Sequence, residues 1–280
     1  MSVKIMIDSA SDITKQEAEE LGFLFMPIQV RLDGEEYFDG VDLLPEEFYE
    51  KLVSSKEMPQ TSLINSYRWN EAFEEATKNG DEIIAITLSS KISGTYEAAV
   101  EASKNFNGKV IVVDSLNAAL GERLLGSYAL ELAKQNLSAS EIAEKLNEKK
   151  LNIKLYAVID TLKYLKKGGR ISAATAFFGE MLSIKPIVGV IDGKVEVIGK
   201  AKGNKKGNQY LISKVDEVGG VDFDMPYGLL YSGNEKSNIE KFTTDCEYLF
   251  ANIKPESFIL GCTIGTHIGP GAVGIAFFSK

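Results

Sequence analysis

The sequence predicts an α/β protein with an N-terminal domain on a parallel sheet and a C-terminal α+β domain whose sheet is mostly antiparallel. Through the first 165 residues, short β-branched runs alternate with helical patterns, which is the order of a doubly wound parallel sheet. Beyond that point two strands follow each other directly around Asp192-Gly193, a pair typical of hairpin turns. A chain of 280 residues has the length of two ordinary domains, so we expect them at 1–165 and 166–280.

The N-terminal part contains five apolar runs that we expect to be strands. They lie at residues 3–8, 23–32, 82–89, 109–115 and 154–160. Helical patterns separate most of these runs, at 67–80, 94–106 and 117–136, and we expect Ser66 to cap the first of these helices.

Residues 30–60 interrupt the alternation of strands and helices. Asp33-Gly34 predicts a hairpin turn, and Pro45 predicts the start of a helix because proline is favoured in the first turn. The helix is expected over 45–55. We interpret this segment as an excursion from the sheet.

The C-terminal part opens with the hairpin at 185–201. A helix, a strand and another helix follow, and the last two strands are expected at 257–265 and 271–278. This order suggests an antiparallel sheet with helices on one face.

Composition excludes several classes of function. The net charge of -9 argues against general affinity for nucleic acid, which rewards basic surfaces. The two cysteines, Cys246 and Cys262, are too few for a disulfide framework and lack the spacing of a metal site. No signal segment and no run of membrane-spanning length is evident, so we expect a cytoplasmic protein that binds no metal.

Small polar residues fill four loops of the predicted N-terminal domain, at 8–12, 60–66, 89–95 and 114–117. In open α/β sheets, ligands bind beyond the carboxyl ends of the strands, so such loops are candidates for a binding site. Ser93 and Gly94 stand at the start of a helix, where backbone N–H groups and the helix dipole favour an anion. The alternative is that each of these residues only caps a helix.

His267 is the single histidine of the chain, and the segment 263–274 around it holds four glycines and a proline. It could be a turn residue, a cap or the polar end of a binding site. The neighbouring glycines favour the last of these, because they let the backbone approach a ligand closely. A serine-dependent ester or thioester hydrolase that uses Ser93 and His267 in a Ser-His-Asp arrangement is a second hypothesis, although Ser93 lacks the G-x-S-x-G pattern. No phosphate-loop or dinucleotide motif is present, so the chain is not expected to bind ATP by itself.

Six blocks of the sequence carry a resemblance to a known family. They read "QTSLINS", "LSSKISGTYEAA", "VIVVDS", "LKYLKKGGRIS", "LSIKPIVGVIDGKVEVIGKAKGNKKG" and "IGTHIGPGAVGIAF". In this order they resemble the DegV family, the fatty-acid-binding subunits of bacterial fatty acid kinase. The resemblance implies a two-domain fold with one long-chain fatty acid between the domains and no other cofactor.

The resemblance also implies a role and a set of site residues. The protein would not be catalytic alone, but would present the carboxyl group to a separate ATP-dependent kinase subunit that makes an acyl phosphate for phospholipid synthesis. The matching positions for the carboxyl ligands are Thr61, Ser62, Ser93, Gly94, Thr266 and His267. His267 would then be a donor that anchors the carboxyl group, with the last two strands closing over it.

The tail of the fatty acid needs an apolar lining. Candidates are Ile92 and four residues on an expected helix, namely Phe177, Phe178, Met181 and Leu182. A helix with such an apolar stripe is also typical of ordinary core.

The segment from Lys163 to Lys206 carries ten basic residues and three acids. Such an excess can steer an acidic partner or an anionic membrane surface, or it can be a solvated face. The candidates for docking the kinase subunit are Arg170, Lys202, Lys205 and Lys206. Two positions depart from the family pattern. Asn65 replaces a usual proline, and Lys202 stands where arginine is frequent. A lysine cannot make the bidentate phosphate contact of an arginine.

Overall fold

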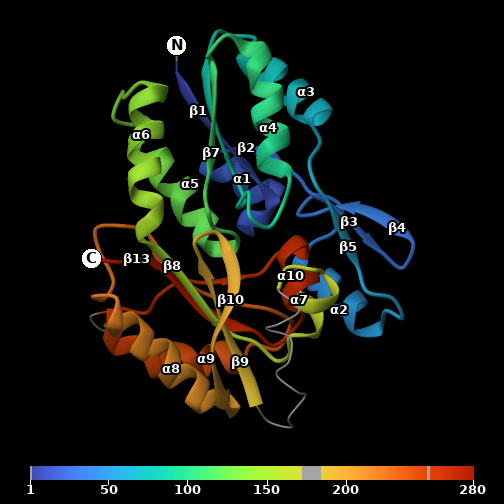
Figure 1. The fold of residues 1–280 in the computed structure, drawn as a ribbon, viewed down its shortest axis with the longest axis vertical. Helices are drawn as coiled ribbons and strands as arrows, with labels where there is room; N and C mark the ends of the chain where they lie inside the picture. The colour runs from blue at the N-terminus through green and yellow to red at the C-terminus, as the bar shows by residue number, and fades with distance from the viewer. Residues whose placement is uncertain (1, 172–183, 251–252) are drawn as a thin grey trace.

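The computed structural model describes residues 2–171, 184–250 and 253–280. Within them, one sheet has four parallel strands in the order β2-β1-β6-β7 and occupies the upper half of the molecule in Figure 1. Its strands are β1 (Val3–Asp8), β2 (Leu24–Met26), β6 (Glu82–Thr87) and β7 (Val110–Asp114). The parallel sheet predicted for the N-terminal part is confirmed.

Helices cover both faces of this parallel sheet. Successive residues of a strand point to opposite faces, and here both sets of side chains are apolar and must be buried. Ile5 and Ile7 of β1 pack in the core formed with α1, α5 and α6, whereas Met6 packs in the core formed with α3 and α4. These helices are α1 (Lys15–Leu21), α3 (Ser66–Thr77), α4 (Thr95–Ser103), α5 (Ala119–Ala133) and α6 (Ala139–Lys149). This cover is the doubly wound arrangement.

A second sheet has six strands in the order β10-β9-β8-β13-β11-β12. Its strands are β8 (Ile153–Val158), β9 (Ile184–Ile191), β10 (Lys194–Lys202), β11 (Tyr227–Tyr231), β12 (Ser257–Ile259) and β13 (Val273–Phe278). Only β11 and β12 pair in parallel, so the mostly antiparallel sheet is confirmed. Asp192 and Gly193, with φ of 48° and 80°, form the turn between β9 and β10, which is the left-handed pair that a tight hairpin requires.

The two faces of the six-stranded sheet meet different partners. Tyr156 and Val158 share a core with α8 (Gly203–Glu217) and α9 (Ser237–Cys246). Leu155 and Ala157 point to the other face and join the core that contains α5. Since α5 also contacts β1 of the parallel sheet, it lies between the two sheets and joins the halves of the molecule.

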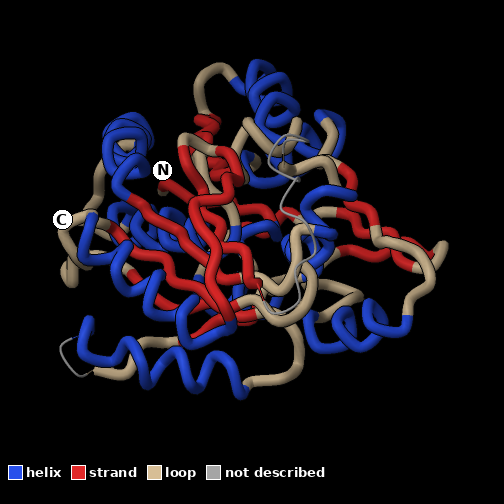
Figure 2. Tube along the Cα trace, turned by 60° about the horizontal axis from the view of Figure 1, so that its bottom comes forward, coloured by secondary structure: helices blue, strands red, loops and turns tan. Residues whose placement is uncertain are grey.

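The predicted excursion forms a third sheet of three antiparallel strands in the order β4-β3-β5. It contains β3 (Gln29–Leu32), β4 (Glu35–Phe38) and β5 (Gln60–Ser62), together with helix α2 (Pro45–Ser54). Figure 2 shows its strands projecting at one side of the molecule. The hairpin at Asp33-Gly34 and the helix that starts at Pro45 are both confirmed.

The remaining helices are short. They are α7 (Lys163–Lys167), α10 (Cys262–Ile268) and the 3₁₀ turns η1 (Ser9–Ser11), η2 (Lys104–Phe106), η3 (Lys150–Asn152) and η5 (Glu247–Phe250). Among the described residues, none of the helices combines the length and the apolar character that crossing a bilayer demands.

One strand prediction in the N-terminal part was wrong, and a second strand forms as predicted but lies in a different sheet. The run at 23–32 is not one strand, because Pro27 lacks an N–H and separates β2 in the parallel sheet from β3 in the third sheet. The run at 154–160 forms β8, but in the six-stranded sheet. Its apolar pattern does not encode which strands it will pair with.

Two further predictions of local structure were also wrong. The strand expected at 257–265 ends at Ile259, and a helix begins at Cys262, because a short apolar run does not distinguish strand from helix. The cap of α3 is Asn65 rather than Ser66. Its side-chain oxygen accepts the N–H of Arg68 at 3.0 Å.

Candidate functional site

A cavity of about 290 Å³ lies between the six-stranded sheet and the loops that follow the parallel strands. This is close to the lower end of the volumes typical of small-molecule pockets. Its apolar floor comes from one face of the six-stranded sheet, at Leu155, Ala157, Val188, Val190, Val195 and Leu230. Ala118 and Ala119, where α5 begins, contribute small side chains to the opposite wall.

Polar groups line the same cavity where the third sheet, α4 and α10 meet. Thr61 and Ser62 come from β5, Ser93 and Gly94 from the start of α4, and His267 from α10. Gly94 lies so close to Leu63 that a Cβ there would stand 3.2 Å from the leucine Cδ2. The N-terminus of α4 and the end of β5 are therefore adjacent.

Arg170 joins these groups from the other side. Its Nε donates to the carbonyl oxygen of Ile92 at 3.2 Å, and its Nη1 donates to the carbonyl oxygen of Gly168 at 2.6 Å. Gly168 in turn contacts His267, because a Cβ on Gly168 would stand 2.2 Å from Nδ1 of the imidazole. Residues from β5, α4, α10 and the α7 segment thus form one polar wall.

The imidazole of His267 has two different nitrogen environments. Nε2 lies 3.0 Å from Oγ1 of Thr61, which is hydrogen-bonding distance. Nδ1 is buried and has no hydrogen-bond partner within the described residues. Burial, and secondarily the charge of Arg170, lower the pKa of His267 to about 4, so the ring is neutral at neutral pH. If Thr61 donates to Nε2, then Nδ1 carries the proton and is a free donor.

Ser93, which precedes the cap of α4, already has a partner in the first residue of that helix. Its Oγ accepts the N–H of Thr95 at 3.2 Å and lies 3.0 Å from the Thr95 hydroxyl. Within the described residues, Ser93 makes no hydrogen bond to His267 and no carboxylate contacts Nδ1. The arrangement therefore lacks both bonds that define a Ser-His-Asp triad.

The structure brings together most of the predicted site residues. Those that line the cavity are Thr61, Ser62, Ile92, Ser93, Gly94, Arg170 and His267. Thr266 does not line it, because its hydroxyl donates to the carbonyl oxygen of Cys262 at 2.8 Å inside α10. Phe177, Phe178, Met181 and Leu182 lie outside the described residues.

Thr263 lines the cavity and was missed from the sequence. Residues four apart share a face of a helix, so Thr263 and His267 point to the same side of α10, while Thr266 points elsewhere. The signal was present as T-x-x-x-H, but it has meaning only once this segment is known to be helical.

Two of the four polar loops serve the fold instead of the cavity. Asp8 accepts the N–H groups of Ala10 and Leu88, both at 2.9 Å, and so joins the loops after β1 and β6. Asp114 accepts the N–H groups of Ser90 and Leu116. The capping interpretation holds for Asp8, which caps η1, whereas Asp114 braces the two loops without capping a helix.

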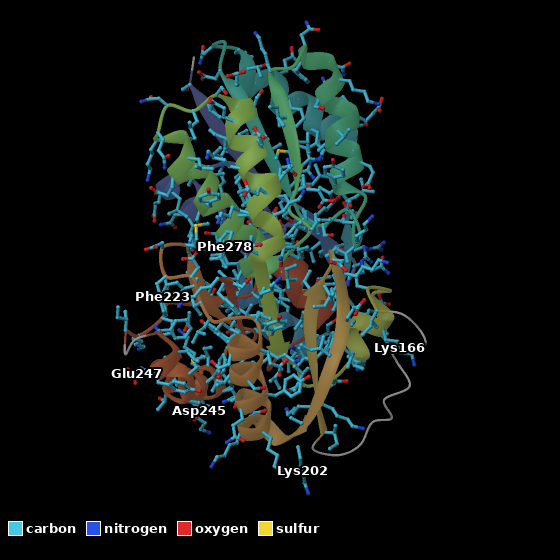
Figure 3. The ribbon with its side chains drawn as sticks, turned by 60° about the vertical axis from the view of Figure 1, so that its left-hand side comes forward. Lys166, Lys202, Phe223, Asp245, Glu247 and Phe278 are labelled. Carbon is cyan, nitrogen blue, oxygen red and sulfur yellow. The ribbon has the colours of Figure 1, made fainter. Side chains whose placement is uncertain are left out.

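The candidate docking lysines lie apart from the cavity. Lys202 ends β10, and Lys205 and Lys206 lie on α8; all three are exposed. Figure 3 shows Lys166 and Lys202 extending from the lower half of the molecule, whereas Asp245 and Glu247 lie on its other side. Of the four candidates, only Arg170 reaches the cavity wall.

Comparison with known proteins agrees with this architecture. The family described as "Uncharacterised protein, DegV family" matches residues 2–280. The chain belongs to the DegV family. A DegV domain-containing protein of Caldanaerobacter subterraneus is 36% identical over 284 residues, which cover 99% of each chain.

Solved DegV structures have the same fold. One from Thermus thermophilus, described for its fatty acid binding, superposes with a TM-score of 0.88 at 29% identity over 100% of each chain. DegV from Bacillus subtilis, described as a fatty acid binding protein, gives a TM-score of 0.85 at 28% identity, again over 100% of each chain. Fatty acid binding is thus a property of DegV proteins.

The electrostatics of the site predict how His267 titrates. Its pKa of about 4 lies below the ordinary value of 6.5, so the unfolded chain binds the proton more readily. The stability that the neutral ring contributes is therefore present above pH 6.5 and is lost as the pH falls toward about 4. In NMR spectra the single imidazole should stay neutral between about pH 5.5 and 8, with the urea-unfolded chain as control. A midpoint near 6.5 in the folded protein would contradict this assignment.

Proposed function

We propose that this chain binds one long-chain fatty acid, with the tail over the apolar floor and the carboxyl group at the polar wall. The observation that carries the proposal is a single cavity that joins an apolar sheet face to hydroxyl, amide and imidazole groups. The fatty acid binding described for the Thermus thermophilus and Bacillus subtilis relatives supports the same ligand class.

The tail supplies most of the binding free energy. Removing roughly 14 methylenes from water at about 0.8 kcal/mol each gives on the order of 11 kcal/mol before the entropy of binding is subtracted. Leu155, Val188 and Leu230 offer the apolar contacts for it. Hydrophobic contact is non-directional, so it does not decide which end of the molecule lies where.

The carboxyl group fixes the direction. A carboxylate is costly to bury without donors, and the polar wall offers the hydroxyl of Ser93, the N-terminus of α4 and, when Thr61 donates to Nε2, the Nδ1–H of His267. The positive charge of Arg170 lies beside them. We assign Ser62, Ser93, Gly94 and His267 to the carboxyl group, give Thr61 the role of fixing the imidazole through Nε2, and leave Thr266 out.

We further propose that the bound acid is presented to a separate ATP-dependent kinase subunit. One carboxylate oxygen would attack the γ-phosphorus of ATP, ADP would leave, and the acyl phosphate would feed phospholipid synthesis. The chain itself has no phosphate-loop motif, so its part is to place the attacking oxygen. Arg170 and the exposed lysines of the basic segment are the proposed docking residues, and an anionic membrane surface is the other occupant of that face.

Extraction of the purified protein tests the ligand class. Organic solvent followed by mass spectrometry should release close to one long-chain fatty acid per chain, because the buried tail dissociates slowly. A sample of the same protein delipidated on a hydrophobic resin is the control, and it should regain one equivalent when the acid is added back. Protein that neither carries nor takes up an acid would overturn the proposal.

Variants of the polar wall separate holding the acid from presenting it. Ser93→Ala removes one of several donors and should weaken binding by about 1–2 kcal/mol. His267→Ala should weaken binding modestly but reduce acyl phosphate formation by about 100-fold, because small displacements of an attacking oxygen are costly. Ser90→Ala, in the same loop as Ser93 but outside the cavity lining, is the matched control. Full activity of His267→Ala in a reconstituted kinase assay would contradict this role.

Charge reversal tests the docking face. Lys202, Lys205 and Lys206 changed together to Glu should weaken coupling to the kinase subunit and leave the lipid content unchanged. The control reverses three exposed lysines of the other half, Lys78, Lys104 and Lys134. Equal coupling of the two triple variants to the kinase subunit at low salt would contradict the docking proposal.

A further inference from the structure

Two buried carboxylates hold the start of helix α10. Asp39, which is 2% exposed, accepts the N–H of Cys262 with Oδ1 and the N–H of Thr263 with Oδ2, both at 2.9 Å. Asp12 accepts the N–H of Gly261, the capping residue, at 2.8 Å. The first N–H groups of a helix have no partner inside it, so these carboxylates fill that need.

The backbone at Asp39 is itself fixed. Its N–H donates to the carbonyl oxygen of Ile28 at 3.0 Å, and the carbonyl oxygen of Gly40 accepts the N–H of Lys15 at 2.9 Å. Gly40 has a φ of 71°, and a Cβ there would stand 3.0 Å from Cα of Thr14. Asp39 therefore lies in a loop after β4 whose backbone is tied to Ile28, just before β3, and to Lys15 at the start of α1.

The third sheet also holds the other end of α10. Thr61 on β5 hydrogen-bonds to His267 in the last turn, and both β4 and β5 pair with β3. Between the two ends, Gly265 packs so closely on Tyr49 of α2 that a Cβ would stand 2.7 Å from the tyrosine oxygen. The excursion from the parallel sheet thus contacts α10 at its start, middle and end.

We propose that Asp39 is a positioning residue for His267, and that it acts by fixing the N-terminus of the helix that carries the imidazole. The positioning itself follows from the contacts of α10. Only its consequence for the ligand rests on the proposed function, namely that the imidazole that binds the carboxyl group is held in place from the third sheet. A carboxylate suits this task because both of its oxygens accept. An asparagine keeps one acceptor oxygen and would turn its NH₂ group toward the other N–H donor. That N–H and the NH₂ group would then both lack an acceptor.

The test replaces Asp39 by Asn and observes the single histidine by NMR. We expect α10 to shift and the imidazole to gain solvent, so that the pKa of His267 rises by about one unit or more from about 4. Asp42→Asn is the matched control, since Asp42 lies three residues on, is exposed and accepts the N–H of Phe38 without touching α10. A folded Asp39→Asn protein with wild-type imidazole shifts and pKa would overturn the proposal, as would an equal change in the control.

A merely structural role is distinguished by a second variant. Asp39→Glu keeps both acceptor oxygens and is expected to fold, with its extra methylene displacing the start of α10. The imidazole signals of His267 should then move less than in Asp39→Asn, and acyl phosphate formation should recover in part. If Asp39→Asn does not fold, Asp39→Glu alone decides, because imidazole signals identical to the wild type would refute positioning.

The NMR readout is independent of the ligand. If the wild-type protein carries no fatty acid but Asp39→Asn moves the imidazole, the positioning role stands and the proposed function fails. If the wild type carries the acid and the imidazole does not move, the positioning role alone fails.

Discussion

The contact between buried carboxylates and the first amides of α10 is the constraint on which the polar end of the cavity depends. The helix has seven residues, among them Gly265 and several β-branched side chains, a composition that forms helix poorly by itself. Its position must therefore come from tertiary partners, and Asp12 and Asp39 supply them from segments more than 220 residues away in the sequence. Once the helix is placed, Thr263 and His267 face the cavity together.

Apolar and polar contacts in the cavity come from different sheets. The six-stranded sheet gives it an apolar floor, because the alternation of each strand sends Leu155 and Ala157 to one face and Tyr156 and Val158 to the other. The third sheet and the N-terminus of α4 supply the donors. An amphiphile with a long tail and one acidic group matches both surfaces, and its tail can vary without changing the contacts of its head.

The fold was predictable where the signal is local, and the site was predictable where it follows a strand. The hairpin turns at Asp33-Gly34 and Asp192-Gly193 need positive φ at both residues, and Asp-Gly is a residue pair that adopts it readily. Ser93 and Gly94 likewise follow a strand and open a helix. The helix α10 was not predictable, because its partners are distant carboxylates. Thr266 was assigned from the family resemblance alone, and without the helix nothing in the sequence pointed to Thr263 in its place.

The most direct measurement is a crystal structure of the protein with a saturated long-chain fatty acid bound. We expect continuous density for the tail over Leu155 and Val188, with a carboxyl oxygen within about 3 Å of the Ser93 hydroxyl and of Nδ1 of His267. An acid bound in the reverse direction, or one that leaves Nδ1 of His267 without a partner, would contradict it.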